Sequence, residues 1–508
     1  MKKALLNRIV PLLLLLSLLF SMISCGGDNG STGTTTASPG TSDDLPSAEA
    51  IDLSGYVIIR PDGAAERVKS AAQSLRTSLK DAGFQISLVS DANQQPIDKE
   101  ILIGDTSRPE SAEVKAELGD ENWKIAAKNG KLVLAGTSDL YVKKAVEVFI
   151  AVYVEKGECS ALSADLVLLC SDVIMPMIDF KWKDGTISVI SGGAWGPRVY
   201  TMSNGELIAG YETSSGIKTA ISQNNAKLWK FQASASFRPQ NSCANVNFYE
   251  FEGKIYMSYR ATGGSSKSYT SLQVSVSEDF GRTWKHHSTI AEYDEDGGVW
   301  EPCLGEIDGK LTVFYACDAR SVTSRQNIES KTWDGSKWTK RTIISNGEKH
   351  NSRDGMPVWI RLSTGTYICV IESQKYAGSG HPFIIQYLTS EDGKKWSEPV
   401  DAYIPTTNGS KAGAPGIIEL STGQVVISFQ TDEDATQKGD RTSVMKTITS
   451  KVSDLSKFKL RNFTASDNVF ATPDGEGSTW SGIWYYDGWL YAAAGTREGA
   501  SLNRIDIG

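Results

Sequence analysis

The octapeptide SEDFGRTW, from Ser277 to Trp284, matches the pattern S-x-D-x-G-x-T-W at every fixed position and decides the fold of this chain. In a turn, an Asp carboxylate can accept backbone N–H bonds, a Gly permits a positive φ, and a closing Trp can pack between neighbouring sheets. The pattern therefore predicts a turn with a structural role. Its fixed positions are Ser277, Asp279, Gly281, Thr283 and Trp284.

A second pattern repeats around the octapeptide from residue 197 onward. Six times, an apolar strand, a Gly-centred turn and another apolar strand follow one another. The turn glycines are Gly205, Gly253, Gly309, Gly365, Gly423 and Gly488. They are 48 to 65 residues apart, which is the length of a four-stranded propeller blade with a variable loop. We expect a strand within Phe180–Ile190 to complete the last blade and leave no exposed edge.

Shorter versions of the octapeptide end at Trp396 and Trp229. The octapeptide resembles the Asp-box turn of sialidase-like β-propellers, and the six hairpins match the six blades of that ring. The resemblance implies a mainly β fold, in which a small α/β domain precedes a six-bladed sialidase-like β-propeller over residues 173–508.

The first 49 residues have the composition of an export signal and a tether. Lys2, Lys3 and Arg8 precede an apolar run, which ends in a lipobox-like site before Cys25. We expect a lipoprotein signal peptide over 1–24, a lipid on Cys25 and a flexible tether over 25–49. An uncleaved anchor is the alternative, but the run is shorter than a membrane span requires. The prediction is a lipid-anchored protein of the bacterial envelope, with the periplasmic and surface-exposed locations both open.

Residues 50–172 alternate between strand and helix patterns, with a helix expected over 64–82 and another over 140–154. They predict a small α/β domain. It resembles the accessory domain that precedes the catalytic domains of α-glucuronidases and β-hexosaminidases, and the stretch EILIGDTSRPES from Glu100 is most like it.

Charge and composition exclude several functions. The net charge is −8 and the pI about 5.3, which disfavours nucleic-acid binding. The cysteines lack metal-ligand spacing and the chain has only four histidines, so we expect no metal and no cofactor. Cys303 and Cys317 flank the Gly309 hairpin, and both a disulfide and free thiols remain open. The oligomeric state cannot be read from the sequence, and a monomer is the expectation.

Blade geometry predicts where functional groups gather. The turn glycines lie on one face, so residues about eight before or seven after each glycine lie on the other. Glu301, in Trp300-Glu301-Pro302, and Glu372, seven residues after Gly365, are two such residues. Paired carboxylates at one mouth are what glycoside hydrolysis needs. Each glutamate alone could equally serve a turn or an arginine such as Arg353.

The stretches that begin at Val299, Ser352 and Ala412 resemble blades of glycoside hydrolase family 93, the exo-acting α-L-arabinanases. In that family two glutamates about 70 residues apart act in a retaining mechanism, and Glu301 and Glu372 are 71 apart. The resemblance implies that these two are the catalytic pair, without assigning their roles. It implies an oligo- or polysaccharide substrate.

Other rim residues are expected to contact the sugar. They are Arg198, Asn245, Arg260, Arg353, Asp354, Gln430, Asp432 and Trp480. Two further functions stay open. An exo-α-sialidase would use Arg198, other arginines and a tyrosine nucleophile such as Tyr485 or Tyr486. A glycan-binding surface lipoprotein without catalysis would use the aromatic and amide groups alone.

Overall fold

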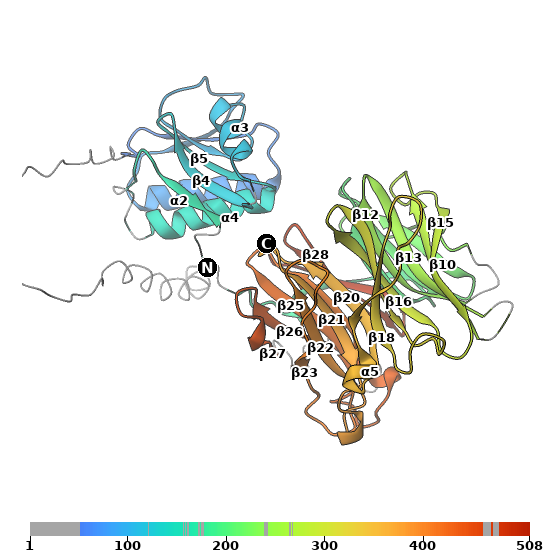
Figure 1. Cartoon of the computed structure of the whole chain (residues 1–508). Coiled ribbons are helices and arrows are strands. Elements are labelled where there is room, and N and C mark those ends of the chain that lie inside the picture. The colour runs from blue at the N-terminus through green and yellow to red at the C-terminus, as the bar shows by residue number, and fades with distance from the viewer. Residues whose placement is uncertain are drawn as a thin grey trace, which may run out of the picture. The chain divides into compact units, whose positions relative to one another are not determined.

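The structure is a computed structural model (Figure 1). It describes residues 51–508 except 120, 156, 158, 160–161, 171–172, 174–176, 238–241, 264–265, 267, 461–468 and 471–476. The expected signal peptide, Cys25 and the tether therefore lie outside the described residues. The chain divides into two compact units between Pro176 and Met177, close to the boundary expected at 172. Within the described chain, no helix has the length and apolar character to cross a membrane.

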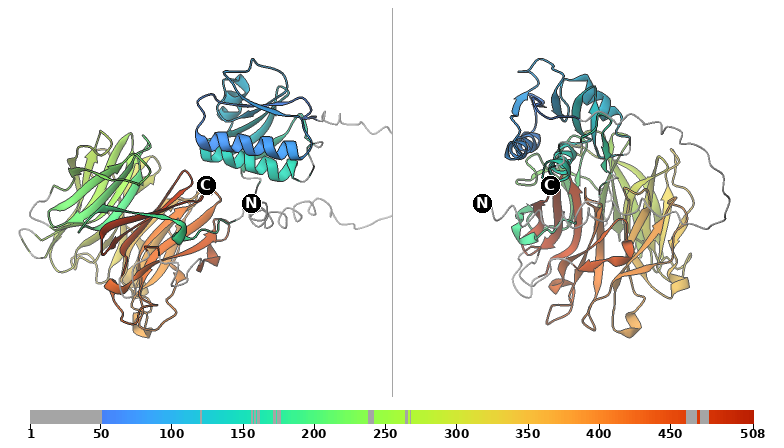
Figure 2. Two further views of the ribbon diagram at one scale, coloured as in Figure 1. Left: turned by 180° about the vertical axis from the view of Figure 1, so that it is seen from behind. Right: turned by 90° about the vertical axis from the view of Figure 1, so that its left-hand side faces the viewer.

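The first unit is a mixed sheet with helices on both faces (Figures 1 and 2). Its strands are β1 (Val57–Arg60), β2 (Ser87–Ser90), β3 (Glu100–Ile103), β4 (Trp123–Lys128), β5 (Lys131–Gly136) and β6 (Val167–Leu169), and its helices are α2 (Glu66–Asp81), α3 (Pro109–Ala116) and α4 (Asp139–Phe149), which continues as a π-helical turn (Ile150–Val154). The sheet order is β2-β1-β3-β5-β4-β6, in which β4 alone runs antiparallel to the other strands.

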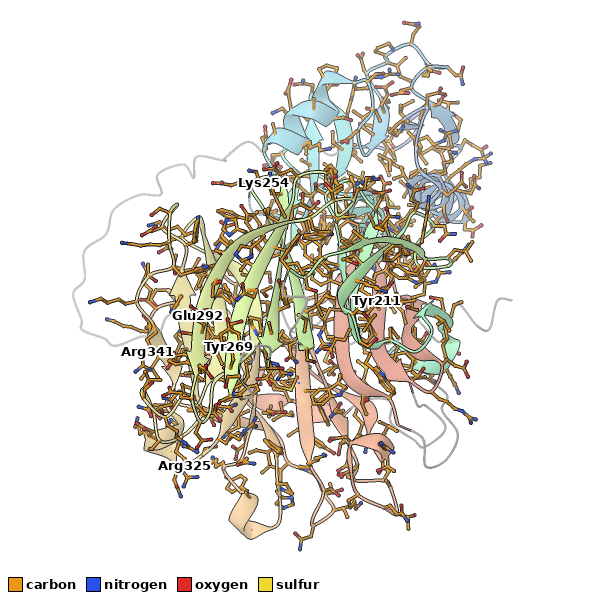
Figure 3. All side chains as sticks on the ribbon, turned by 90° about the vertical axis from the view of Figure 1, so that its right-hand side faces the viewer. Tyr211, Lys254, Tyr269, Glu292, Arg325 and Arg341 are labelled. Carbon is orange, nitrogen blue, oxygen red and sulfur yellow. The ribbon has the colours of Figure 1, made fainter. Side chains whose placement is uncertain are left out.

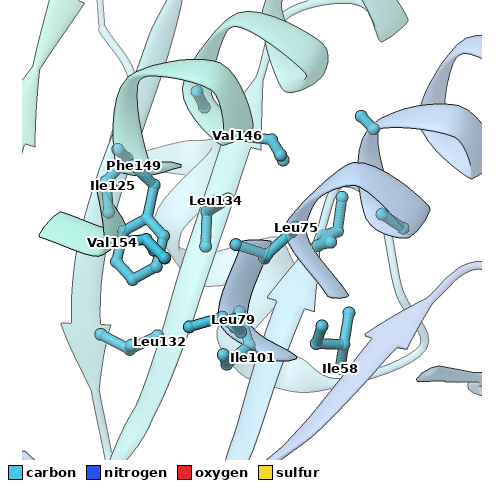
Figure 4. Close-up of a cluster of buried hydrophobic side chains, with 14 of the residues drawn as sticks. Ile58, Leu75, Leu79, Ile101, Ile125, Leu132, Leu134, Val146, Phe149 and Val154 are labelled. Carbon is cyan, nitrogen blue, oxygen red and sulfur yellow. The ribbon is translucent and has the colours of Figure 1, made fainter. Parts of the chain in front are cut away.

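Because side chains alternate along each strand, the hydrophobic core of this unit lies on both faces of the sheet. Ile58 packs with Leu75 of α2 and Val146 of α4, as Figure 4 shows. Its neighbour Ile59 packs on the opposite face with Val114 of α3. The sequence predicted α2 and α4 but missed α3, an eight-residue helix that begins with proline at its first position.

The second unit consists of six four-stranded antiparallel sheets, which we number as blades in chain order. Blade 1 has β8 (Trp195–Thr201), β9 (Leu207–Thr213), β10 (Gly216–Ser222) and β11 (Lys230–Ser234); blade 2 has β12 (Ser242–Phe251), β13 (Lys254–Thr262), β14 (Tyr269–Ser277) and β15 (Lys285–Asp294); blade 3 has β16 (Val299–Ile307), β17 (Lys310–Cys317), β18 (Asn327–Thr332) and β19 (Thr342–Ser345). Blade 4 has β20 (Asp354–Arg361), β21 (Tyr367–Ser373), β22 (Ile384–Ser390) and β23 (Val400–Tyr403); blade 5 has β24 (Ala412–Glu419), β25 (Gln424–Thr431), β26 (Val444–Lys451) and β27 (Lys459–Leu460); blade 6 has β28 (Thr479–Tyr486), β29 (Trp489–Thr496), β30 (Gly499–Asp506) and β7 (Thr186–Ser191).

The six blades close into a ring. The first strand of each blade contacts the first strand of the next, in the order β8, β12, β16, β20, β24 and β28, and β28 returns to β8. The outermost strand of blade 6 is β7, which comes from upstream in the chain and overlaps the stretch expected to supply it. The fold is therefore the six-bladed β-propeller that the hairpin repeat predicted. The short helix α5 (Gly347–His350) follows β19.

The octapeptide turn and its copy in blade 1 lie at one end of the ring and make the interactions that their sequences predict. Asp279 accepts the N–H groups of Arg282 and Thr283 at 3.1 and 2.8 Å, and Gly281 has a φ of 75°. Trp284 packs in a core shared by blades 1 and 2. In blade 1, Asn224 replaces the aspartate and accepts the N–H of Leu228 at 2.9 Å.

Side chains also link strands on the outer part of the blades. In Figure 3, Tyr269 of β14 and Glu292 of β15 are labelled on neighbouring strands of blade 2, and the tyrosine hydroxyl donates to Glu292 at 3.0 Å. All six cysteines of the described chain are free thiols, so Cys303 and Cys317 do not form the disulfide that the sequence left open.

Candidate functional site

Six equivalent bulges define one end of the propeller. The first strand of each blade shifts its register once near its start. One residue in every bulge has a left-handed backbone, a conformation that is uncommon outside glycine. These residues are Gly196, Asn245, Glu301, Met356, Ala414 and Trp480, with φ between 46° and 60°. The bulge turns the side chain of this residue out of the strand's alternation, and in blade 3 that side chain is a carboxylate.

The second strand of each blade places one residue opposite the bulge. That residue lies seven positions after the hairpin glycine and pairs with the residue just before the left-handed one. Around the ring these residues are Glu212, Arg260, Ala316, Glu372, Gln430 and Gly495. We call them the mouth ring. Glu301 in blade 3 and Glu372 in blade 4 therefore belong to adjacent blades at the same end of the propeller.

Three members of the mouth ring make the same hydrogen bond. Each accepts the backbone N–H of the left-handed residue in the next blade. Glu212 accepts from Asn245 at 2.8 Å, Glu372 from Ala414 at 3.1 Å, and Gln430 from Trp480 at 2.6 Å. The contact joins neighbouring blades and satisfies an N–H that the bulge removes from the sheet. A mouth-ring carboxylate is thus fixed in place by the fold itself.

Glu301 is a carboxyl group with few partners. Its Oε2 is buried and has no hydrogen-bond partner within the described chain. Burial raises the pKa of Glu301 to about 7, and the nearby charge of Glu372 adds to the rise, whereas Arg260, Arg353 and the Met356 N–H oppose it. The side chain is therefore suited to carry a proton near neutral pH.

Glu372 has a hydrogen-bond partner on each carboxylate oxygen. Arg353 donates to its Oε1 at 3.2 Å, and the Ala414 N–H reaches its Oε2. Both contacts favour the ionised form of a carboxylate. Glycines on both sides leave it space, because a Cβ at Gly413 would lie 2.6 Å from Oε2 and one at Gly355 would lie 3.2 Å from Oε1.

The other charged groups of the mouth come from blades 1, 2 and 4. Arg198 donates to the carbonyls of Pro197 and Trp480 at 2.9 and 2.7 Å. Arg260 lies over the ring of Trp300 at 5.0 Å, and Arg353 over that of Phe383 at 5.3 Å. The two arginines act electrostatically on Glu301, so cationic groups and both carboxyls share one region.

Six of the eight expected sugar contacts belong to this end of the propeller. They are Arg198, Asn245, Arg260, Arg353, Gln430 and Trp480. The side-chain Oδ1 of Asn245 is buried and has no partner in the described part of the chain. The indole of Trp480 is 39% exposed. Trp480 is therefore accessible to a ligand, whereas the Asn245 oxygen is a buried acceptor that the described residues leave unpaired.

Asp354 and Asp432 both have structural partners, although Oδ1 of Asp354 is buried without a partner in the described residues. Asp354 is buried and accepts from Ser345 Oγ at 2.6 Å, in the outer strand of blade 3. Asp432 is buried and accepts the N–H groups of Lys411 and Gly439 at 2.9 and 2.8 Å, which fixes a loop. These contacts give both aspartates a structural role, and their contact with a sugar stays a prediction.

Trp195 was missed by the sequence analysis. It pairs with Glu212 in the sheet, packs against Gly495 and is 49% exposed. A signal was present, because Trp195-Gly196-Pro197 repeats the frame of Trp300-Glu301-Pro302. Trp195 in blade 1 and Trp480 in the adjacent blade 6 thus place two exposed indoles at the same end as the carboxyls.

Glu212 was placed at the rim by its spacing but was not counted among the site residues. Burial raises its pKa, while the Asn245 N–H, Arg198 and Arg260 lower it. In the described chain, no group of three His, Cys, Asp or Glu residues is arranged to hold a metal ion. The site is therefore described by its carboxyls, arginines and indoles.

The fold and the site together define a six-bladed β-propeller with a carboxyl pair at one end of its ring. No family model and no curated protein matches the chain. Among solved structures, it is similar to an α-L-arabinanase of Penicillium chrysogenum complexed with arabinobiose, at 17% identity and a TM-score of 0.49, over 65% of this chain and 99% of that one.

Two further structures are similar over comparable lengths. The family 93 α-L-arabinofuranosidase of Fusarium graminearum with arabinobiose has 19% identity and a TM-score of 0.48, over 65% of this chain and 98% of that one. A Hadza microbial sialidase has 14% identity and a TM-score of 0.44, over 62% and 66%. At such identities and scores, the activity of this chain has to be inferred from its own residues.

Proposed function

We propose that this protein is a glycoside hydrolase with Glu301 and Glu372 as its catalytic pair. The observation that carries the proposal is the contrast between the two neighbouring carboxyls. Burial favours the protonated form of Glu301, while Arg353 and the Ala414 N–H favour the ionised form of Glu372. One acid and one carboxylate beside the same space are the two groups that glycosidic cleavage uses.

The contrast supports one assignment of roles in a retaining mechanism. Glu372 attacks the anomeric carbon, and Glu301 donates its proton to the leaving oxygen as the glycosidic bond breaks. The sugar is then an ester on Glu372, and Glu301 is ionised. Glu301 next takes a proton from water, whose oxygen attacks the same carbon and releases Glu372. Both carboxyls return to their first state.

The substrate that we propose is a terminal arabinose unit of an arabinan-like chain, removed in an exo-acting manner. The sequence resemblance around Glu301 and Glu372 supports this choice. The exposed indoles of Trp195 and Trp480 suit the apolar C–H face of a sugar ring. With a lipid on Cys25, the enzyme would act outside the cytoplasm, held at the cell envelope.

A sialidase is the competing function, and the tyrosines argue against it. Such an enzyme requires a tyrosine nucleophile beside the substrate carboxylate site. Tyr485 packs in the core of blade 6, and Tyr486 pairs with Trp489 at the hairpin turn. Both lie at the end of the blade opposite Trp480. Neither tyrosine therefore reaches the arginines at the mouth.

The test is sugar release by the chain from residue 26 onward, incubated with linear arabinan and with sialyl-oligosaccharides. The expected result is arabinose or a short arabinose product, with little released by Glu301→Gln or Glu372→Gln. Proton NMR of the first product distinguishes retention from inversion at the anomeric carbon. Sialic acid release would favour the competing enzyme. Binding of either glycan without release would favour a lipoprotein that only binds glycans.

A further inference from the structure

A cavity lies at the end of the propeller opposite the carboxyl pair, where the hairpin turns gather. Its volume is about 420 Å³, within the range of small-molecule sites. It lies between the turns of blades 1 and 2. The residues that matter here are Glu206, Gln223, Asn224, Leu228, Trp229 and Arg282. Glu206 directly follows the hairpin glycine Gly205, whereas Glu212 of the same strand lies at the mouth, so the cavity and the carboxyl pair occupy opposite ends.

The polar wall of the cavity is fixed before any ligand arrives. Arg282 Nη2 donates to both oxygens of Glu206, at 3.1 and 2.8 Å, and Gln223 Nε2 donates to Oε1 at 2.6 Å. The carboxylate and the guanidinium neutralise each other. The exposed Lys230 is left as the net charge of the lining. An acceptor (Glu206), a donor (Arg282) and an amide that does both (Gln223) therefore stand side by side, as hydroxyl recognition requires.

The apolar wall is exposed to solvent. Leu228 is 73% exposed although it is a leucine, and the half-buried indole of Trp229 lies next to it. The octapeptide turn of blade 2 and its degenerate copy in blade 1 both contribute to the lining. Gln223 and Arg282 are variable positions of these turns, whereas Leu228 and Trp229 stand where the octapeptide has Thr283 and Trp284.

We propose that this cavity is an auxiliary binding site for a neutral saccharide, separate from the carboxyl pair. A sugar ring presents hydroxyls that donate and accept, which fit the fixed Glu206, Gln223 and Arg282 groups, and an apolar C–H face, which fits Trp229 and Leu228. The ligand class follows from the cavity alone. The proposal therefore holds whether or not the mouth hydrolyses glycans.

Blade 3 provides a matched comparison. Trp338 donates its indole N–H to Ser288 in the outer strand of blade 2 at 2.9 Å, and Trp229 does the same to Ser188 in the outer strand of blade 6 at 3.2 Å. The two indoles have the same place in the inter-blade packing. Only Trp229 lines the cavity described above. Replacing each by alanine thus separates loss of packing from loss of a ligand contact.

The experiment is affinity electrophoresis of the chain from residue 26 onward, carrying Glu301→Gln so that turnover does not alter the polymer. Gels contain linear arabinan, soluble arabinoxylan or polygalacturonan, and retardation gives a dissociation constant. We expect retardation by a neutral polymer, weakened about tenfold by Trp229→Ala and several-fold by Leu228→Ser. Trp338→Ala should leave it unchanged.

Three outcomes would overturn the proposal. They are no retardation by either neutral polymer, retardation by polygalacturonan alone, and equal retardation of the parent protein and both cavity variants. The third outcome would place the binding at the mouth. Leu228→Ser keeps the test valid if Trp229→Ala does not fold, because the exposed Leu228 side chain contributes little to the core.

Discussion

Glu212 in blade 1 and Glu372 in blade 4 occupy the same position, yet their neighbours differ. Each accepts the N–H of the left-handed residue in the following blade. The left-handed residue of the preceding blade is Trp480 for Glu212 and Glu301 for Glu372. The propeller thus supplies a fixed carboxylate in both places. Of these two glutamates, only Glu372 has a second carboxyl beside it in the preceding blade. We infer that the catalytic role of such a carboxylate depends on the left-handed residue of the preceding blade.

The largest expected difference between the two blades is in activity. Glu372→Gln should lower kcat/KM on an arabinan oligosaccharide by about 1,000-fold or more, because an amide cannot form the glycosyl ester. Glu212→Gln should lower it by less than about tenfold. Both glutamines keep an oxygen that accepts the Asn245 or Ala414 N–H, so both variants should fold. Equal losses in the two variants would remove the distinction between the blades.

The second prediction concerns Glu301, the neighbour that blade 1 lacks. Glu301→Gln should lower kcat/KM by about 100-fold or more on natural linkages, but far less on aryl glycosides whose leaving groups need no proton. With a pKa of about 7, Glu301 loses its proton above neutral pH, so wild-type kcat/KM should fall there. A loss independent of the leaving group would assign Glu301 another role.

The sequence predicted the hairpin turns and the mouth-ring positions on which this comparison depends. All six hairpin glycines have the left-handed backbone that such turns require. Counting seven residues onward then gave the mouth ring, because strands of equal length return to the same height. Counting backward was less accurate. Eight residues before Gly365 and Gly423 are Pro357 and Pro415, one residue after the left-handed Met356 and Ala414, because each bulge inserts residues that spacing alone does not reveal.

Side-chain direction explains the structural partners of the two aspartates. Asp354 precedes Gly355, the partner of Glu372 in the sheet, so strand alternation turns its carboxylate to Ser345. Asp432 lies just beyond β25, where a loop captures its oxygens. The cavity beside Trp229 could not be found at all, because Glu206 and Arg282 are 76 residues apart and meet only when two blades pack.

The third prediction uses the glycines that make room for the two carboxylates. A Cβ at Gly413 would lie 2.6 Å from Glu372 Oε2, and one at Gly196 would lie 2.5 Å from Glu212 Oε1. Gly413→Ala should displace Glu372 and lower kcat/KM by about tenfold or more. Gly196→Ala should lower stability by about 1 kcal/mol, because its φ of 53° disfavours alanine, with a smaller effect on rate.

Similar rate losses in the two glycine variants would contradict this difference. Steady-state kinetics and urea unfolding of the same preparations separate the two effects. A KM that rises while kcat stays constant in Gly413→Ala would also count against displacement of Glu372, because a displaced nucleophile slows the chemical step.

The smallest expected effect is on stability, and it differs in kind between blades 3 and 4. The folded-state pKa of Glu301 is above the ordinary 4.5. The contribution of this carboxyl to folding stability is therefore complete below pH 4.5 and is lost as pH rises through about 7. The full shift would be worth about 3 kcal/mol, and partial exposure reduces this to about 1 to 2 kcal/mol. Urea unfolding should show that the stability of Glu301→Gln relative to wild type rises by that amount between pH 5 and pH 8. Glu372→Gln should instead lose stability at pH 8, because it breaks the contact of a charged carboxylate with Arg353. A gain for Glu301→Gln that is the same at both pH values would mean that Glu301 is not held protonated by the fold.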